Sequence, residues 1–344
     1  MKTSIKIQEN ISLAEFTTFK IGGNARFFVR AENESEIIEA FNFADEHDFD
    51  VFVLGGGSNV LISDQGFDGL VLQIALRGIA FKDNIVIAQA GEDWDVFVAK
   101  CVENDLQGVE CLSGIPGFTG GTPVQNVGAY GQEVSETITK VRAFDRKSKL
   151  ILELSNEECK FAYRTSIFNS SDSNRFIVLA VTFELKQNAQ PKIVYKDLRE
   201  YFRDKNPDLA ETRQAVLEIR RAKSMVIDEN DPNSKSAGSF FKNPIVSNEK
   251  LAEMSVKFPD LVIPNFKFDE QNVKIPAAWL IENSGFQKGF RKGRAGISTK
   301  HTLALVNFDN ADAEEIISLQ NEIQMQVEKK FGISLIPEPV FVGF

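Results

Sequence analysis

The sequence predicts an α+β fold in which strands outnumber helices. Short apolar or alternating runs of strand length recur through the N-terminal half, and amphipathic helical patterns lie between and after them. Glycine-rich loops interrupt both patterns. At 344 residues, the chain also exceeds what one hydrophobic core usually serves, so about two domains are expected.

Most of the predicted strands lie in the N-terminal half. The segment 16–29 reads as two extended pieces joined by a turn at Gly22–Asn24. Asn33 and Glu36 form a capping box for a helix with Ile37, Phe41 and Ala44 on its apolar face, and a second helix follows Asp93. The strands are expected at 50–54, 60–62, 70–74, 85–88, 141–145, 150–154 and 176–185.

The composition changes from about Gln187 onward. The chain becomes more polar there, and prolines occur at 191, 207 and 232, which indicates a boundary region between domains. Beyond it a strand is expected within 303–308, and helices are expected at 209–223, 248–257, 277–283 and 311–331.

Composition and charge exclude several classes of function. The 43% hydrophobic and 26% charged residues are typical of a soluble globular protein, and no apolar run approaches the roughly 18 residues of a membrane span. The N-terminus lacks a signal-peptide pattern, so a cytoplasmic protein is expected. A net charge of −10 argues against nucleic acid or an anionic membrane as a partner.

The cysteines and histidines restrict the chemistry further. Cys101, Cys111 and Cys159 form no CxxC pair, so we expect buried thiols rather than disulfides or a zinc site. No metal is expected. With His47 and His301 as the only histidines, catalytic triads and zinc hydrolysis lose most of their usual residues.

A long loop at 112–131, LSGIPGFTGGTPVQNVGAYG, is the most distinctive stretch of the chain. Six glycines and two prolines rule out a regular helix or strand, and the segment carries almost no charge. Ordering so many glycines costs entropy that a ligand can offset, so we interpret the loop as a backbone cradle for a large anionic ligand.

A second glycine segment, GGGSN at 55–59, lies between two predicted strands. It does not match a Rossmann fingerprint, because Val60 occupies the third glycine position and a strand follows it instead of a helix. The Walker lysine is absent from both segments. The GGGSN loop is either an anion-binding nest of N–H groups or a simple tight turn.

Four further features have a chemical and an ordinary interpretation. Glu338 between Pro337 and Pro339 is either an exposed or ion-paired carboxylate, or one held for catalysis. Arg164 can bind a carboxylate or phosphate, or form a surface salt bridge. Ser239 in AGSFF is a turn hydroxyl or a catalyst, and the basic stretch 288–294 is an anion site or a solvated loop.

Six motifs in order give the chain a family resemblance. They are TTFKIGGNA (17–25), GGGSNVL (55–61), IPGFTGGTPVQNVGAYG (115–131), YRTSIF (163–168), AGSFFKNP (237–244) and PEP (337–339). With them the chain resembles, over nearly its full length, the UDP-N-acetylenolpyruvoylglucosamine reductases, flavoenzymes of bacterial peptidoglycan precursor synthesis often called MurB. Tyr195 and YRTSIF resemble the type I form of the family, which has an added tyrosine-bearing loop over the substrate.

The resemblance implies a domain organisation and a cofactor site. It implies an FAD-binding domain of the PCMH or vanillyl-alcohol-oxidase type at 1–190, with subdomains at about 1–67 and 68–190. A C-terminal α+β substrate-binding domain would span 191–344, with its last strand, at about 335–343, returning toward the FAD site. The residues implied to hold FAD are Gly55, Gly56, Gly57, Ser58, Asn59, Val60, Ile115, Pro116, Gly117, Gly120, Gly121, Thr122, Gln125, Asn126, Gly128, Ala129 and Ile177.

The resemblance also implies a reaction. NADPH reduces FAD and leaves, and the hydride then passes to the enol carbon of UDP-N-acetylglucosamine enolpyruvate, giving UDP-N-acetylmuramate. Arg164 and a protonated Glu338 would stabilise the enolate-like intermediate, and Ser239 would deliver the proton. Substrate-binding residues would be Tyr163, Tyr195, Lys223 and Asn243. We expect a monomer.

Two other functions stay open at this level. One is a flavin oxidase of the same cofactor-binding class that acts on an alcohol or sugar, although neither glycine segment contains a histidine that could tether FAD covalently. The other is a nucleotide-sugar-binding protein without turnover, which the presence of Arg164, Ser239 and Glu338 disfavours.

Overall fold

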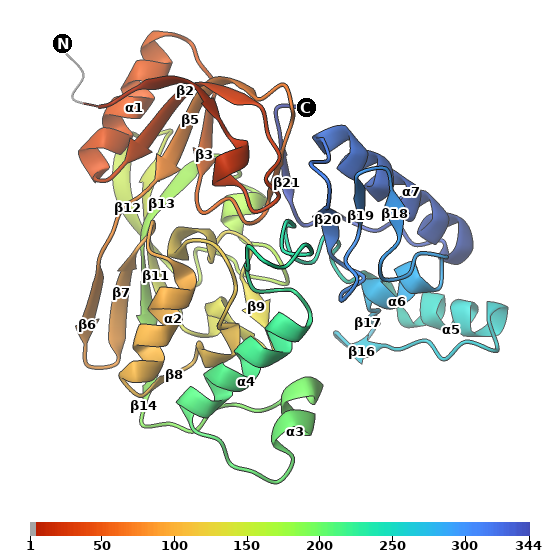
Figure 1. The fold of residues 1–344 in the computed structure, drawn as a ribbon. Helices are drawn as coiled ribbons and strands as arrows, with labels where there is room; N and C mark the ends of the chain where they lie inside the picture. Colours follow the sequence, from red (N-terminus) through yellow and green to blue (C-terminus); the bar gives the residue numbers. More distant parts are fainter. Residues whose placement is uncertain (1–4) are drawn as a thin grey trace. The chain divides into compact units, whose positions relative to one another are not determined.

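The computed structural model describes residues 5–344, which form two units (Figure 1). Of the described residues, the first unit comprises 5–11, 24–57 and 67–226, and the second comprises 12–23, 58–66 and 227–344. The mixture of sheets and helices in both units confirms the predicted α+β class.

The first unit is built on two sheets. A four-stranded sheet has the order β1-β2-β5-β3, in which β5 pairs in parallel with both β2 and β3. A five-stranded antiparallel sheet has the order β12-β11-β13-β7-β6. The strands are β1 (Gln8–Ser12), β2 (Asn24–Ala31), β3 (Val51–Leu54), β5 (Phe67–Ile74), β6 (Ile79–Lys82), β7 (Ile85–Gln89), β11 (Ile138–Asp145), β12 (Leu150–Ser155) and β13 (Phe176–Glu184).

Helices α1 and α2 begin at the predicted positions, although only the Asn33 half of the predicted capping box forms. In α1 (Glu34–Glu46), Asn33 Oδ1 accepts from the N–H of Glu36, while the Glu36 carboxylate accepts from the N–H of Glu32. In α2 (Trp94–Glu103), Asp93 caps the helix, and Trp94 and Phe97 are fully buried, each contributing about 1.5–3 kcal/mol. The remaining elements are α3 (Lys196–Phe202), α4 (Leu209–Ala222) and the short strand pairs β8 (Leu106–Gln107) with β14 (Lys186–Gln187) and β9 (Gly128–Ala129) with β10 (Gln132–Glu133).

The second unit has three small sheets and a long helix. Its elements are β4 (Val60–Ile62), β15 (Ile245–Ser247), α5 (Asn248–Lys257), β16 (Phe266–Lys267), β17 (Asn272–Lys274), α6 (Ala277–Glu282), β18 (Arg291–Lys292), β19 (Ala295–Ile297), β20 (Leu305–Asn307), α7 (Ala313–Phe331) and β21 (Val340–Val342). The last strand, β21, pairs in parallel with β4, the strand that follows the GGGSN loop. The hydrophobic core of this unit contains the apolar face of α7 together with Phe240, Phe241 and Leu280.

The units divide the chain differently from the expected boundary at 190. Residues 191–226 belong to the first unit, because Leu198 and Phe202 of α3 and Val216 of α4 pack with Cys111 in one apolar cluster. Two short N-terminal segments, 12–23 and 58–66, belong to the second unit, where Phe19, Ile21 and Leu61 join its core. The change in composition near 190 reflects a solvent-exposed connection. The long-range packing contacts, and not this change in composition, determine which unit each segment belongs to.

Candidate active site

The two glycine segments come together in the first unit. A Cβ added at Gly56 would lie 2.8 Å from the Cα of Gly117, so the backbones of the GGGSN loop and of 112–131 approach more closely than side chains allow. At Gly55 and Gly121, an added Cβ would meet no protein atom within 4 Å. Glycine backbone that is packed on one side and open on another is what close approach to an extended ligand requires, so these residues fit the predicted FAD cradle.

The long loop is fixed by hydrogen bonds to the start of α2. The backbone N–H of Thr119 donates to Glu92 O and that of Gly120 donates to Ala90 O, both at 2.8 Å. Trp94 binds the loop twice, through its backbone N–H to Gly117 O and through Nε1 to Leu112 O, both at 3.0 Å. The predicted cradle is therefore an ordered segment with its own scaffold.

Asn126 organises the second half of the loop. It has a positive φ of 45° and is 1% exposed. Its Nδ2 donates to the Glu133 carboxylate (2.8 Å) and to Ala162 O (3.1 Å), and its Oδ1 accepts from the N–H of Ser135. The side chain thus joins the glycine loop to the YRTSIF segment, and a contact with FAD stays a prediction for this residue.

Arg164 is directed by the same loop. Its Nη2 donates to Gly128 O at 2.6 Å and its Nη1 to Asn126 O at 3.4 Å, and the guanidinium lies 5.5 Å from the centre of the Tyr163 ring. A Cβ at Gly128 would lie 3.2 Å from Arg164 Nη1, so glycine leaves room for this approach. The structure therefore brings Tyr163 and Arg164 to the cradle.

Tyr195 and Lys223 are brought together by α3 and α4. Tyr195 precedes α3 and is 44% exposed, and its ring meets that of Tyr130 edge to face at 5.3 Å. Lys223 caps the C-terminus of α4 and donates to Asp197 of α3 at 2.5 Å. Burial, followed by the charge of Asp197, raises the pKa of the Tyr195 hydroxyl. Tyr130 is not among the predicted site residues, although its position at the end of the glycine loop could have suggested that it lies near the predicted ligands.

Ser239 and Glu338 lie on neighbouring segments of the second unit. The N–H of Glu338 donates to Phe240 O at 2.8 Å, and the N–H of Lys242 donates to Ile336 O at 2.9 Å. The AGSFF segment therefore runs beside the PEP segment. Because the adjacent Phe240 is fully buried, the backbone at Ser239 is held in place, while both Ser239 and Glu338 remain partly exposed.

Asn59 joins the GGGSN loop to the same pair of segments. Its Nδ2 donates to Glu338 O at 3.2 Å, and its backbone O accepts from the N–H of Val340 at 3.0 Å. Asn243 has a structural bond as well, because its Oδ1 accepts from the N–H of Ala277 at the start of α6 (2.9 Å). Ser239, Asn243, Glu338 and Asn59 therefore belong to one region of the second unit.

Some predicted features have ordinary structural roles. Ile177 lies in β13 within the core and is 2% exposed, so its contact with FAD stays a prediction.

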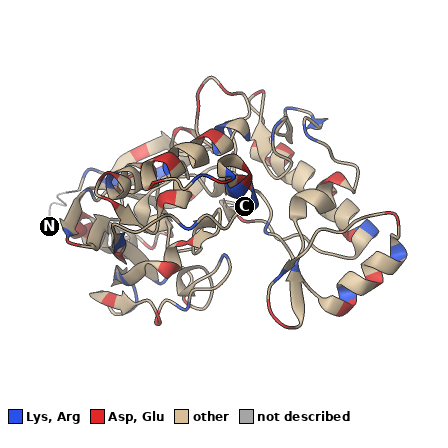
Figure 2. Cartoon of the chain, turned by 90° about the horizontal axis from the view of Figure 1, so that it is seen from below, with Lys and Arg blue, Asp and Glu red and all other residues tan. Residues whose placement is uncertain are grey.

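In the basic stretch 288–294, Arg291, Lys292 and Arg294 form ion pairs with carboxylates at or near α7. Figure 2 shows acidic and basic residues interspersed along the chain. The solvated-loop interpretation therefore holds for these three cations.

The three cysteines are buried thiols, as predicted. Burial raises the pKa of all three, that of Cys159 to about 12. Within 5–344, no group of three or more potential metal ligands occurs. No helix in the described part of the chain combines the length and apolarity needed to cross a bilayer.

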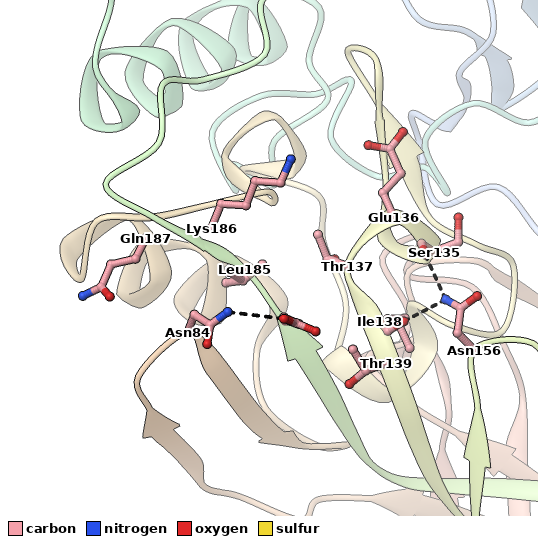
Figure 3. Close-up of a pocket in the computed structure, with 11 residues that line it drawn as sticks. Asn84, Ser135, Glu136, Thr137, Ile138, Thr139, Asn156, Leu185, Lys186 and Gln187 are labelled. Atoms are coloured by element: carbon pink, nitrogen blue, oxygen red, sulfur yellow. Dashed lines mark hydrogen bonds between the residues drawn. The ribbon is translucent and has the colours of Figure 1, made fainter.

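A polar cavity of about 780 Å³ lies elsewhere in the first unit (Figure 3). It is lined by residues at the start of β11 and the end of β13, and it contains none of the predicted site residues. Asn156 Nδ2 donates to the backbone oxygens of Ser135 and Ile138, so this side chain serves the local fold. We assign the site by the glycine cradle and not by this cavity.

Comparisons with known proteins agree with the motifs. A family model described as UDP-N-acetylenolpyruvoylglucosamine reductase, C-terminal domain, matches residues 231–342, and one described as FAD binding domain matches residues 25–152. The second match confirms the FAD-binding class of the N-terminal half. A solved structure of the MurB reductase from Thermus caldophilus has the same fold, with a TM-score of 0.69 and 24% identity over 98% of this chain and 99% of that one.

Curated relatives match nearly the whole chain. The UDP-N-acetylenolpyruvoylglucosamine reductase of Thermobifida fusca is 42% identical, with 97% of each chain covered. That of Streptomyces coelicolor is 44% identical over 96% of this chain and 89% of its own length. The chain therefore belongs to the UDP-N-acetylenolpyruvoylglucosamine reductase family.

Proposed function

We propose that this protein reduces UDP-N-acetylglucosamine enolpyruvate to UDP-N-acetylmuramate, with FAD as cofactor and NADPH as electron donor, in peptidoglycan precursor synthesis. The observation that carries the proposal is identity above 40% over nearly the full length to reductases of this name. We further propose that it acts as a cytoplasmic monomer.

The glycine cradle would hold FAD. Neither the segment 55–59 nor the segment 115–129 contains a lysine, so glycine-rich backbone rather than a side-chain cation would hold the pyrophosphate in this acidic protein. The N–H groups of Thr119 and Gly120 are not part of that set, because the scaffold before α2 uses them. When bound, FAD supplies two-electron redox chemistry that carries a hydride from NADPH to the enolpyruvyl group. The protein's own residues must then stabilise the negative charge that hydride addition creates and supply a proton.

Arg164 is suited to stabilise the negative charge that hydride addition creates. Its guanidinium is directed by Gly128 O and by the Tyr163 ring, and a planar cation pre-oriented in this way can bind the substrate carboxylate as charge builds on it. Glu338, in its protonated form, would donate a hydrogen bond to the same developing charge. Tyr163, Tyr195, Lys223 and Asn243 would hold the UDP-sugar, and Tyr195 would do so from the loop of the type I form.

Ser239 would deliver the proton. A serine hydroxyl is a weak acid in water, but the carbanionic intermediate is basic enough to take its proton. The buried Phe240 holds the adjacent backbone, so the hydroxyl is presented from a rigid segment.

The Ser239→Ala variant tests this assignment under anaerobic conditions. We expect reoxidation of the reduced flavin by the enolpyruvyl sugar nucleotide to slow by about 10²-fold or more, while flavin reduction by NADPH is nearly unchanged. Equal losses in both half-reactions would refute the role of Ser239 as proton donor. Lys242→Ala, a neighbouring change outside the predicted set, is the matched control and should leave both rates within a few-fold of the wild type.

A further inference from the structure

Asp95 lies between the glycine cradle and α4 and has no role in the reaction described above. Its Oδ1 accepts from the N–H of Gly114 at 2.6 Å and from Arg213 Nη1 at 2.6 Å. Its Oδ2 accepts from Arg213 Nη2 at 2.8 Å. One carboxylate thus binds the first glycine of the long loop and, in bidentate fashion, an arginine that is 118 residues away in sequence.

The contact is bidentate and partly shielded from solvent, unlike an isolated surface ion pair. The Arg213 side chain is 17% exposed and that of Asp95 35%. Burial disfavours ionisation of Asp95, but the hydrogen bonds from Arg213 and Gly114, together with the charges of Arg213 and Arg220, leave its pKa below the ordinary value. Asp95 is therefore ionised at neutral pH and holds both partners.

Gly114 is constrained on its other side by α4. Its φ of +71° is in the left-handed region, and an added Cβ would lie 2.8 Å from Leu217 Cδ2 and 3.2 Å from Val226 Cγ2. Two residues further on, Pro116 stiffens the chain, and Gly117 then meets Gly56. A displacement of Gly114 would therefore be passed to the point where the two glycine segments touch.

We propose that Asp95 is a positioning residue for the cofactor: by holding Gly114 and Arg213 together, it sets the cradle against α4 and so determines FAD affinity. The inference rests on the proposed function, since it takes FAD as the ligand of the cradle. It predicts that loss of this contact weakens binding of FAD even where the protein stays folded. A merely structural ion pair would instead stabilise the free and the FAD-bound protein equally.

The first unit contains a matched control pair. Arg175 Nε and Nη2 donate to the two carboxylate oxygens of Asp145, both at 3.0 Å, at the end of β11. This pair is also bidentate and its carboxylate is 2% exposed, but the hydrogen bonds to that carboxylate come from Arg175, Lys147 and Ser148, none of which lies in a glycine segment. Its loss should therefore affect folding without affecting the cradle.

The experiment measures FAD binding and thermal unfolding of apoprotein and holoprotein for Asp95→Asn, Arg213→Lys and Asp145→Asn. We expect the first two to raise the Kd for FAD by about tenfold or more and to shrink the increase in Tm that FAD produces. Asp145→Asn should lower the Tm of both forms alike and leave the Kd within twofold of the wild type. Arg213→Lys keeps the positive charge but loses the bidentate guanidinium contact with Asp95. It therefore tests the inference even if Asp95→Asn does not fold.

A Kd within twofold of the wild type in folded Asp95→Asn or Arg213→Lys would overturn the inference. So would an equal weakening of FAD binding in Asp145→Asn, because the effect would then follow from general destabilisation. If the wild-type apoprotein takes up no FAD, the proposed function fails first, and this outcome is distinguished by the wild-type titration alone.

Discussion

At Gly120 the long glycine loop packs tightly against the residues that precede α2. Its N–H donates to Ala90 O at 2.8 Å, and a Cβ added to Gly120 would lie 2.6 Å from Ala90 Cβ and 3.0 Å from Ala90 Cα and O. The backbone of Gly120 is outside the left-handed region, so the cost of Gly120→Ala is steric alone. The opposing atoms belong to the main chain or to a fixed methyl and cannot rotate away.

The expected loss of stability in Gly120→Ala follows from this geometry. Overpacking by one methyl group typically costs about 1–3 kcal/mol, and each kcal/mol lowers the Tm by about 2–4 °C for a unit of roughly this size. Gly121→Ala is the adjacent control, because an added Cβ there meets no protein atom within 4 Å and φ is compatible with alanine. A compatible replacement of glycine is neutral or stabilises by about 0.4–1 kcal/mol through the unfolded chain.

Thermal unfolding of the apoproteins checks the prediction, and an FAD titration adds the functional result. Gly120→Ala should have a lower Tm than Gly121→Ala and, because the loop is displaced, an FAD Kd at least tenfold above that of the wild type. In the double variant Ala90→Gly/Gly120→Ala, the contact at 2.6 Å is removed, so part of the lost stability should return. Equal Tm values for the two alanine variants would refute the reasoning.

Three further predictions follow from burial and charge. The three cysteines should resist a thiol reagent such as DTNB in the native protein and react only after unfolding, since burial raises the pKa even of Cys159 to about 12; rapid native labelling would contradict this. Hydrogen bonds from Arg175 hold the pKa of Asp145 well below its usual value, so the stability from this pair is present at neutral pH and is lost as pH falls below about 4. Between pH 6 and pH 2, the Tm should therefore fall less in Asp145→Asn than in the wild type. Arg164→Lys loses the fork that reaches Gly128 O, so substrate reduction should slow by about tenfold or more while flavin reduction by NADPH is retained, and stopped-flow traces of the two half-reactions separate these effects.

Local patterns predicted the helices well, because caps act over a few residues. The helix 248–257 has the predicted bounds, and α7 begins two residues later than predicted, where Asp312 and Glu315 form a capping box. The short helix α3 is not evident in the sequence, since seven residues carry little periodicity.

The arrangement of the site depended on long-range pairing that a single sequence does not reveal. Ser239 and Glu338 are distant in sequence and become neighbours only because AGSFF pairs with the segment before β21. Arg213 reaches Asp95 for the same kind of reason, through packing of α4 on the start of α2. The motifs predicted the site residues, and the fold shows which segments lie beside them.

The order of the two half-reactions tests the central claim most directly. The purified protein, loaded with FAD and reduced by NADPH without oxygen, is mixed with UDP-N-acetylglucosamine enolpyruvate, and the visible absorbance of oxidised flavin is followed. We expect rapid reoxidation and formation of one UDP-N-acetylmuramate for each reduced flavin. Flavin that stays reduced until oxygen is admitted would contradict the reductase assignment and would indicate an oxidase.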